Sequence, residues 1–212
     1  MIKVSLLCSL LIMSISNPIT VWAGNSCTYS SYKWNTKLKK AVQRVRLSKP
    51  YHEVTQQERD PLTGCSVCEE DQVTINMPGV KPFRLCRVFA TDVKQILLQQ
   101  YKSGFPFYEI VGYRPGMTRG SVDVQGNRTR FSNHSFGIAV DINPQQNGLY
   151  DRCLKFGAHC RLIRGGIWKP NQSGSLRHDG ALVKAMQAIG FRWGGLILGR
   201  QKDFMHFSPY GY

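Results

Sequence analysis

The sequence predicts an α+β domain with a small, mainly antiparallel sheet flanked by helices. Two segments, 87–102 and 179–189, place apolar residues at helical spacing, and short apolar runs typical of strands lie between and after them. Helices and short strands in this mixed order are typical of α+β folds. A chain of 212 residues is long enough for one domain with a proper core.

The first 23 residues predict a secretory signal peptide. A basic start at Lys3 precedes an apolar run over 4–15, Asn17 and Pro18 break that run, and Val21 and Ala23 put small residues at the cleavage positions. A transmembrane anchor is the alternative, but the run is shorter than the roughly 20 residues that span a bilayer. We therefore expect an exported protein, periplasmic or secreted, without a stable membrane anchor.

Export changes what the cysteines predict. Removal of the signal leaves six of them, an even number that predicts up to three disulfides in an oxidising compartment. The spacing favours Cys153 with Cys160, and the other four are expected to pair as Cys65 and Cys68 with Cys27 and Cys86, in either order. A zinc knuckle at Cys65 and Cys68 is the alternative, but it needs a second close pair of thiolates.

The segments before residue 87 carry weak signals. Residues 24–34 are expected to be irregular, and the basic segment 35–47 predicts either a short helix or a solvated face, the latter being favoured. Residues 51–86 are rich in turn formers, with a short strand at 73–75. We therefore expect a disulfide-stapled subregion over 24–86, followed by the core domain over 87–212.

The core domain has clearer elements. Helix 87–102 ends before Gly104, and helix 179–189 has Asp179 as its expected N-cap and Gly190 at its C-terminal end. Strands are expected at 108–113, 138–142 and 205–207. The two helices present these apolar stripes: Phe89, Val93, Ile96, Leu97 and Tyr101 in the first, and Leu182, Ala185, Met186 and Ile189 in the second.

Segment 132–143 is the most informative for chemistry. From residue 138 onward apolar residues alternate with small or polar ones, so one face of a strand carries the carboxylate of Asp141. His134 precedes Gly137, where the backbone can bend and bring the imidazole to the same side. A histidine and an aspartate together suit zinc.

A second group of candidates lies near the C-terminus, after Trp193-Gly194-Gly195. His206 offers a second imidazole, and Asp203 lies three residues earlier, close enough to reach a water at the metal. Two imidazoles and a carboxylate leave zinc an open position for a water of lowered pKa. Asp203 would take that water's proton, and Arg114 is the candidate group for the oxyanion. Taken singly, each residue also has an ordinary structural interpretation, such as a core histidine or a turn aspartate.

These residues resemble the zinc D-alanyl-D-alanine carboxypeptidase family, which includes VanY-like carboxypeptidases, VanX-like dipeptidases and L-alanyl-D-glutamate endolysins. Its first motif, Ser-x-His-x-x-Gly-x-Ala-x-Asp, is matched by Ser132, His134, Gly137, Ala139 and Asp141. Its second, an acidic residue two positions before a histidine, is matched by Asp203 and His206. Trp193-Gly194-Gly195 also fits, and Tyr113-Arg114 resembles the upstream arginine of the family.

The resemblance covers about residues 87–212 and implies a Hedgehog/DD-peptidase-like zinc peptidase fold. It implies that His134, Asp141 and His206 bind Zn²⁺, that Asp203 is the general base and Arg114 the oxyanion group, and that Ser132 and Trp193 contact substrate. Two features depart from the family: Asp203 stands where many members have glutamate, and the segment between Trp193 and Asp203 is long and basic. The substrate preference within the family therefore stays open.

Charge completes the functional hypotheses. The formal net charge is +15, or +14 once Lys3 leaves with the signal, which favours anionic partners. The leading hypothesis is an exported zinc peptidase that cuts peptidoglycan stem peptides, as carboxypeptidase or endopeptidase. Because Hedgehog domains of this fold bind partners without catalysis, a zinc-stabilised cell-wall-binding module is the alternative. Nucleic acid is not an expected partner, since aromatic residues do not interleave with a basic face, and the oligomeric state stays open.

Overall fold

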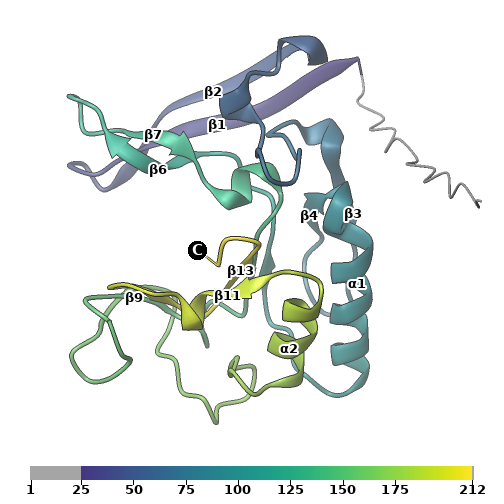
Figure 1. Ribbon diagram of the computed structural model, residues 1–212, viewed down its shortest axis with the longest axis vertical. Helices are drawn as coiled ribbons and strands as arrows, with labels where there is room; N and C mark the ends of the chain where they lie inside the picture. Colours follow the sequence, from purple (N-terminus) through teal and green to yellow (C-terminus); the bar gives the residue numbers. More distant parts are fainter. Residues whose placement is uncertain (1–24, 212) are drawn as a thin grey trace, which may run out of the picture.

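The computed structural model describes residues 25–211, and the predicted signal peptide lies outside them. A four-stranded antiparallel sheet of order β11-β13-β8-β5 forms the centre of the domain (Figure 1). Its strands are β5 (Ile110–Val111), β8 (Val140–Ile142), β11 (Arg192–Trp193) and β13 (His206–Ser208). The fold class is therefore α+β with mostly antiparallel sheets, as predicted, although the described residues form four small sheets rather than the single one expected.

A second sheet, of order β2-β1-β6-β7, contains the longest strands of the described chain. Its strands are β1 (Ser26–Asn35), β2 (Lys40–Pro50), β6 (Met117–Val122) and β7 (Arg128–Phe131). The expectation of irregular structure over 24–34 was wrong, because Cys27, Tyr29 and Ser31 alternate inward from β1. The helix considered for 35–47 was also wrong; the favoured solvated face is present, as the largely exposed strand β2.

Two smaller sheets complete the strands. One pairs β3 (Gln72–Ile75) with β4 (Phe83–Cys86), which confirms the predicted strand at 73–75. The other has the order β10-β9-β12, with β9 at Leu149–Asp151, β10 at Arg161–Arg164 and β12 at Lys202–Asp203. Short 3-10 helices occupy Tyr51–Glu53 (η1), Gln56–Glu58 (η2), Glu69–Asp71 (η3), Asn133–Phe136 (η4) and Gly194–Leu196 (η5).

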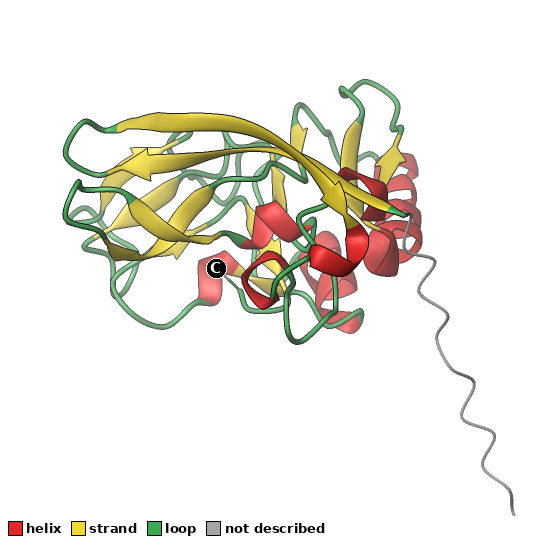
Figure 2. Ribbon diagram, turned by 90° about the horizontal axis from the view of Figure 1, so that it is seen from above, coloured by secondary structure: helices red, strands yellow, loops and turns green. Residues whose placement is uncertain are grey.

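Both predicted helices form. Helix α1 spans Arg87–Lys102 and buries Val93 and Leu97, whereas Tyr101 of the expected stripe is exposed. Helix α2 spans Ala181–Ala188 and begins after Gly180; the expected cap Asp179 instead forms an ion pair with Arg177. Gly190 follows α2 with φ +87°, a conformation that suits glycine at a helix C-terminus. Helices α1 and α2 pack side by side at the end of the molecule away from the β1–β2 turn (Figures 1 and 2).

Two apolar clusters hold these layers together. The larger joins α1 and α2 to the central sheet and includes Leu85, Leu97, Ile142, Met186 and Phe207. The smaller links the β1 region to the chain around η4 and includes Cys27, Val67, Phe131, Phe136 and Ile138. The second cluster packs directly beneath the segment that carries His134, so the N-terminal part of the chain supports it.

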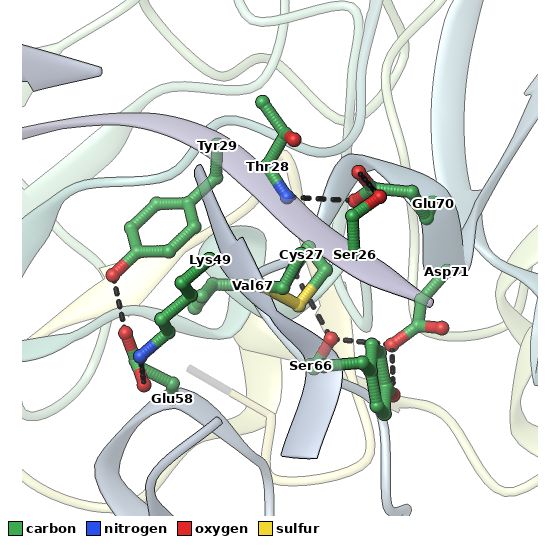
Figure 3. The surroundings of a disulfide bond; sticks show 12 residues. Ser26, Cys27, Thr28, Tyr29, Lys49, Glu58, Ser66, Val67, Glu70 and Asp71 are labelled. Carbon is green, nitrogen blue, oxygen red and sulfur yellow. Dashed lines mark hydrogen bonds and ion pairs between the residues drawn. A yellow bond between two sulfur atoms is a disulfide. The ribbon is translucent and has the colours of Figure 1, made fainter. Parts of the chain in front are cut away.

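Three disulfides connect the predicted cysteines: Cys27–Cys68, Cys65–Cys86 and Cys153–Cys160. The predicted pairing is thus confirmed. Around Cys27–Cys68 a buried polar network joins β1 to the loop beneath it (Figure 3). In this network Glu58 accepts hydrogen bonds from Tyr29 and, at 2.6 Å, from Lys49.

Across residues 25–211, none of the helices combines the length and apolar character that a bilayer crossing requires.

Candidate metal and active site

His134 is positioned by a tight backbone turn after β7. It lies in η4, which begins after Ser132 and ends at Gly137, whose φ is +66°. A Cβ at Gly137 would lie 1.9 Å from Gln72 Oε1 and 2.6 Å from the Cys86 nitrogen, so only glycine fits the turn without displacing its neighbours. This turn directs the His134 imidazole toward the strand that follows it.

Asp141 and His206 are placed by strand register. They are direct partners in the antiparallel pair of β8 and β13, so both side chains leave the same face of the central sheet. All three side chains are buried, with exposures of 3% for His134, 2% for Asp141 and 3% for His206. Residues that are far apart in the sequence thus meet in one protected site.

The three side chains converge on one carboxylate oxygen. Asp141 Oδ1 lies 3.0 Å from His134 Nε2 and 2.9 Å from His206 Nδ1. One potential ligand atom from each residue lies within 4.8 Å of the other two, as a shared metal ion requires. In a tetrahedral zinc site with bonds of about 2.0–2.1 Å, ligand atoms lie ~3.3 Å apart. A slight lengthening of the two separations from Asp141 Oδ1 would therefore accommodate the ion.

The tautomer of His134 also suits a metal ligand. Its Nδ1 lies 2.8 Å from the Gly112 carbonyl oxygen, which only accepts, so Nδ1 carries the proton. Burial lowers the pKa of His134 to about 4, although Asp141 opposes that shift, so the ring is neutral at pH 7. The lone pair of Nε2 then faces a carboxylate oxygen, an arrangement that a cation between them would stabilise.

The charge of Asp141 is maintained despite its burial. Burial alone would raise the pKa of its carboxyl group, but His134 and His206 outweigh that effect and lower the pKa well below its usual value. Arg114 adds an ion pair, with a nitrogen 3.2 Å from Asp141 Oδ2. Oδ2 is thus occupied by Arg114, while Oδ1 faces the two imidazoles.

Asp203 is half-buried, and its carboxylate has one fully buried oxygen. It lies in β12, paired with Leu149 of β9, three residues before His206. Its Oδ1 is buried and has no hydrogen-bond partner within residues 25–211, and the same holds for His206 Nε2. Burial raises the pKa of Asp203 to about 6, and the charge of Asp141 adds to the rise, although His206 opposes it. A buried carboxylate oxygen without a hydrogen-bond partner is costly in a purely structural position.

The two residues expected to contact substrate are both buried. Ser132 caps η4 and its Oγ lies 3.2 Å from Ser135 Oγ. Trp193 is 3% exposed and its indole N–H donates to the Phe204 carbonyl oxygen at 2.8 Å. Both placements favour a supporting role for these side chains; substrate contact stays a prediction.

Two features of the site were not predicted from the sequence. The first is the Gly112 carbonyl, a backbone group that fixes the His134 tautomer. A Cβ on Gly112 would lie 2.3 Å from the Arg84 carbonyl oxygen, so only glycine allows the two backbone segments to lie this close together. Arg119 and Arg164 come close enough to Asp203 for their charges to lower its pKa, against the effect of burial. They belong to β6 and β10, which lie in different sheets, so no sequence pattern grouped them.

Comparison with known proteins agrees with this geometry. Residues 125–209 match the family model described as D-alanyl-D-alanine carboxypeptidase. The match includes His134, Asp141, Asp203 and His206 and confirms the resemblance to the zinc D-alanyl-D-alanine carboxypeptidase family over this part of the chain. It supports a peptidase-type hydrolase with a metal-capable site. Neither a curated protein nor a solved structure matches the chain.

Proposed function

We propose that the protein is an exported zinc metallopeptidase that hydrolyses peptide bonds in peptidoglycan stem peptides. The observation that carries the proposal is the convergence of His134 and His206 on Asp141, within the segment that matches a carboxypeptidase family. The buried, unpartnered Oδ1 of Asp203 supports catalysis rather than structure alone.

In this proposal His134 Nε2, Asp141 Oδ1 and His206 Nδ1 hold Zn²⁺. When bound, the ion would supply Lewis acidity and lower the pKa of a water toward ~7. The Gly112 carbonyl keeps the proton of His134 on Nδ1, and Arg114 holds Asp141 through Oδ2. These contacts leave His134 Nε2 free of a proton and fix the orientation of the Asp141 carboxylate.

Asp203 acts as the general base in this proposal. With a pKa of about 6 its carboxylate is mostly ionised at pH 7 but remains basic enough to accept a proton and return it to the leaving amine. Arg114 is 28% exposed and carries a permanent positive charge, so it can donate to the carbonyl oxygen of a bound substrate. Ser132 and Trp193, which are buried, would support these groups by packing rather than by contact with the reacting atoms.

The remaining parts of the proposal concern fold and location. We propose that residues 87–212 form a Hedgehog/DD-peptidase-like core and that residues 24–86 form a disulfide-stapled subregion attached to it. The three disulfides fit an oxidising compartment, periplasmic or extracellular, where a stem peptide is accessible. The bond that is cleaved, and hence carboxypeptidase or endopeptidase action, is left to experiment.

The test is incubation of the pure protein with isolated muropeptides, followed by mass spectrometry. Cleavage that is lost with a chelator and restored by zinc is expected, and the mass lost identifies the bond. Muropeptides that stay intact at all zinc concentrations, with a folded protein, would refute a stem-peptide hydrolase.

Asp203→Ala separates the enzyme from the alternative, a zinc-stabilised wall-binding module. The variant keeps all three proposed ligands, so zinc binding should persist in both cases. Loss of hydrolysis with zinc retained supports the enzyme. A variant that binds zinc and isolated cell wall unchanged, from a wild type without hydrolytic activity, supports the module.

A further inference from the structure

Two turns meet at the end of the β2-β1-β6-β7 sheet and form one tip. The β1–β2 turn (36–39) and the β6–β7 turn (123–126) lie on the side of the molecule away from helices α1 and α2 (Figures 1 and 2). They are joined by the Thr36 N–H, which donates to the Gly126 carbonyl oxygen at 2.8 Å. We call residues 36–39 and 123–126 the hairpin tip.

A buried asparagine pair fixes the hairpin tip. Asn35 and Asn127 are 4% and 1% exposed, and Asn35 Nδ2 donates to Asn127 Oδ1 at 2.8 Å. Asn35 Oδ1 accepts from the backbone of Lys37 and Leu38 at 3.0 and 2.8 Å, while Asn35 Nδ2 also donates to the Gln125 carbonyl oxygen. The two turns therefore present their side chains from one preorganised backbone.

Each turn carries an apolar side chain at its apex. Leu38 is 60% exposed and Val124 is 94% exposed. Turn apices are usually polar, because an apolar side chain there gains nothing from folding. The two joined turns thus each place one apolar side chain in solvent, and we call Leu38 and Val124 together the apolar prominence.

Cations surround this prominence. Lys37 and Lys39 are exposed on the β1–β2 turn, Lys40 is exposed at the start of β2, and Lys37 Nζ reaches the Val124 carbonyl oxygen at 3.4 Å. Segment 26–50 holds seven Lys and Arg residues and no Asp or Glu. The one acidic residue of the tip, Asp123, accepts hydrogen bonds from the backbone of Gln125 and Asn127 at 3.0 and 2.8 Å, so its carboxylate is engaged within its own turn.

We propose that the hairpin tip is a reversible docking site for an anionic lipid bilayer surface. Lysines attract the anionic headgroups, and the apolar prominence enters the boundary between headgroups and acyl chains, while the lysine stems extend along the same surface. A purely anionic polymer, such as a phosphate-rich wall polymer, would use the lysines alone and leave Leu38 and Val124 in water. The apolar apices therefore favour the bilayer, and the proposal does not depend on the metal site being catalytic.

The experiment is vesicle co-sedimentation of the purified, disulfide-bonded protein. Vesicles of zwitterionic phosphatidylcholine are compared with vesicles containing 30% phosphatidylglycerol (about a third anionic lipid, as an attractive surface of this kind requires). Three variants are tested: Leu38→Ser with Val124→Ser, Lys37, Lys39 and Lys40 all to Gln, and the matched control Lys94, Lys102 and Lys184 all to Gln on α1 and α2. All these side chains are exposed, so the variants are expected to fold.

The wild type should bind the anionic vesicles and not the zwitterionic ones. The tip lysine variant should lose about 100-fold in affinity, from about fivefold per lysine, and the control should stay within about twofold, because the attraction acts within a Debye length. The serine double variant should lose at least about tenfold. Serine substitution without effect, or a wild type that ignores the anionic vesicles while binding isolated cell wall, would overturn the proposal.

Discussion

Asp203→Asn should make the metal-free protein more stable while abolishing the proposed hydrolytic activity. The pKa of Asp203 is raised from 3.8 to about 6 by burial, so the folded state favours the protonated carboxyl. The corresponding stability is present below pH 4 and lost as the pH rises through 6. A shift of about two units amounts to ~2–3 kcal/mol at pH 7. Asparagine is neutral at every pH and avoids this cost.

The assay is urea unfolding of the oxidised protein in a chelator, at several values between pH 4 and 8. The difference in unfolding free energy between Asp203→Asn and wild type should be near zero at pH 4 and reach about 2–3 kcal/mol at pH 7. Asp92→Asn, on the exposed side of α1, is the matched control and should change stability by less than about 0.5 kcal/mol. A variant no more stable than wild type at pH 7 would refute the cost assigned to the buried carboxylate.

Three further predictions concern the supports of the site. Burial raises the pKa of Glu58, but hydrogen bonds from Lys49, Tyr29 and Thr55 outweigh that effect and lower the pKa from 4.5 to about 2. The ionised Glu58 therefore stabilises the folded state above pH 4.5, and this contribution is lost as the pH falls toward 2. In urea unfolding at pH 7, Glu58→Gln should lower the unfolding free energy by about 3 kcal/mol, and the control Glu53→Gln should leave it unchanged. Gly137→Ala, at φ +66° and with a Cβ 2.6 Å from the Cys86 nitrogen, should lower the unfolding free energy by at least about 2 kcal/mol, and Gly79→Ala, where the Cβ meets open space, should cost less. Arg114→Gln removes the partner of Asp141 Oδ2 and should weaken zinc binding about 10–100-fold by calorimetry; an unchanged affinity would mean that the ion pair does not orient Asp141.

The elements that the sequence predicted are those whose signal is local. Helix α1 repeats apolar residues at helical spacing, and the turn at Gly137 is encoded by the glycine that its positive φ requires. His134 and Asp141 were proposed as ligands because they occur at a spacing that one turn and one strand can close, and His206 was proposed separately as a second imidazole near the C-terminus. The pairing of Cys153 with Cys160 followed from proximity along the chain, whereas the order in which Cys65 and Cys68 pair with Cys27 and Cys86 did not.

The features that the sequence did not predict depend on distant or backbone partners. Strand β1 buries Cys27, Tyr29 and Ser31, an alternation too polar to be recognised, and β2 buries almost nothing, so its pattern is that of a solvated segment. The contact of His134 with the Gly112 carbonyl joins residues 22 positions apart through a backbone atom. Asp179 does not cap α2, because the helix begins after Gly180, and its carboxylate pairs with Arg177 instead.

Anomalous diffraction at the zinc absorption edge, from a crystal grown with zinc, tests the central claim most directly. One strong anomalous peak is expected within bonding distance, about 2.0–2.2 Å, of His134 Nε2, Asp141 Oδ1 and His206 Nδ1. A peak held by other residues, or none at this site under saturating zinc, would contradict the assignment of these three side chains as a metal centre.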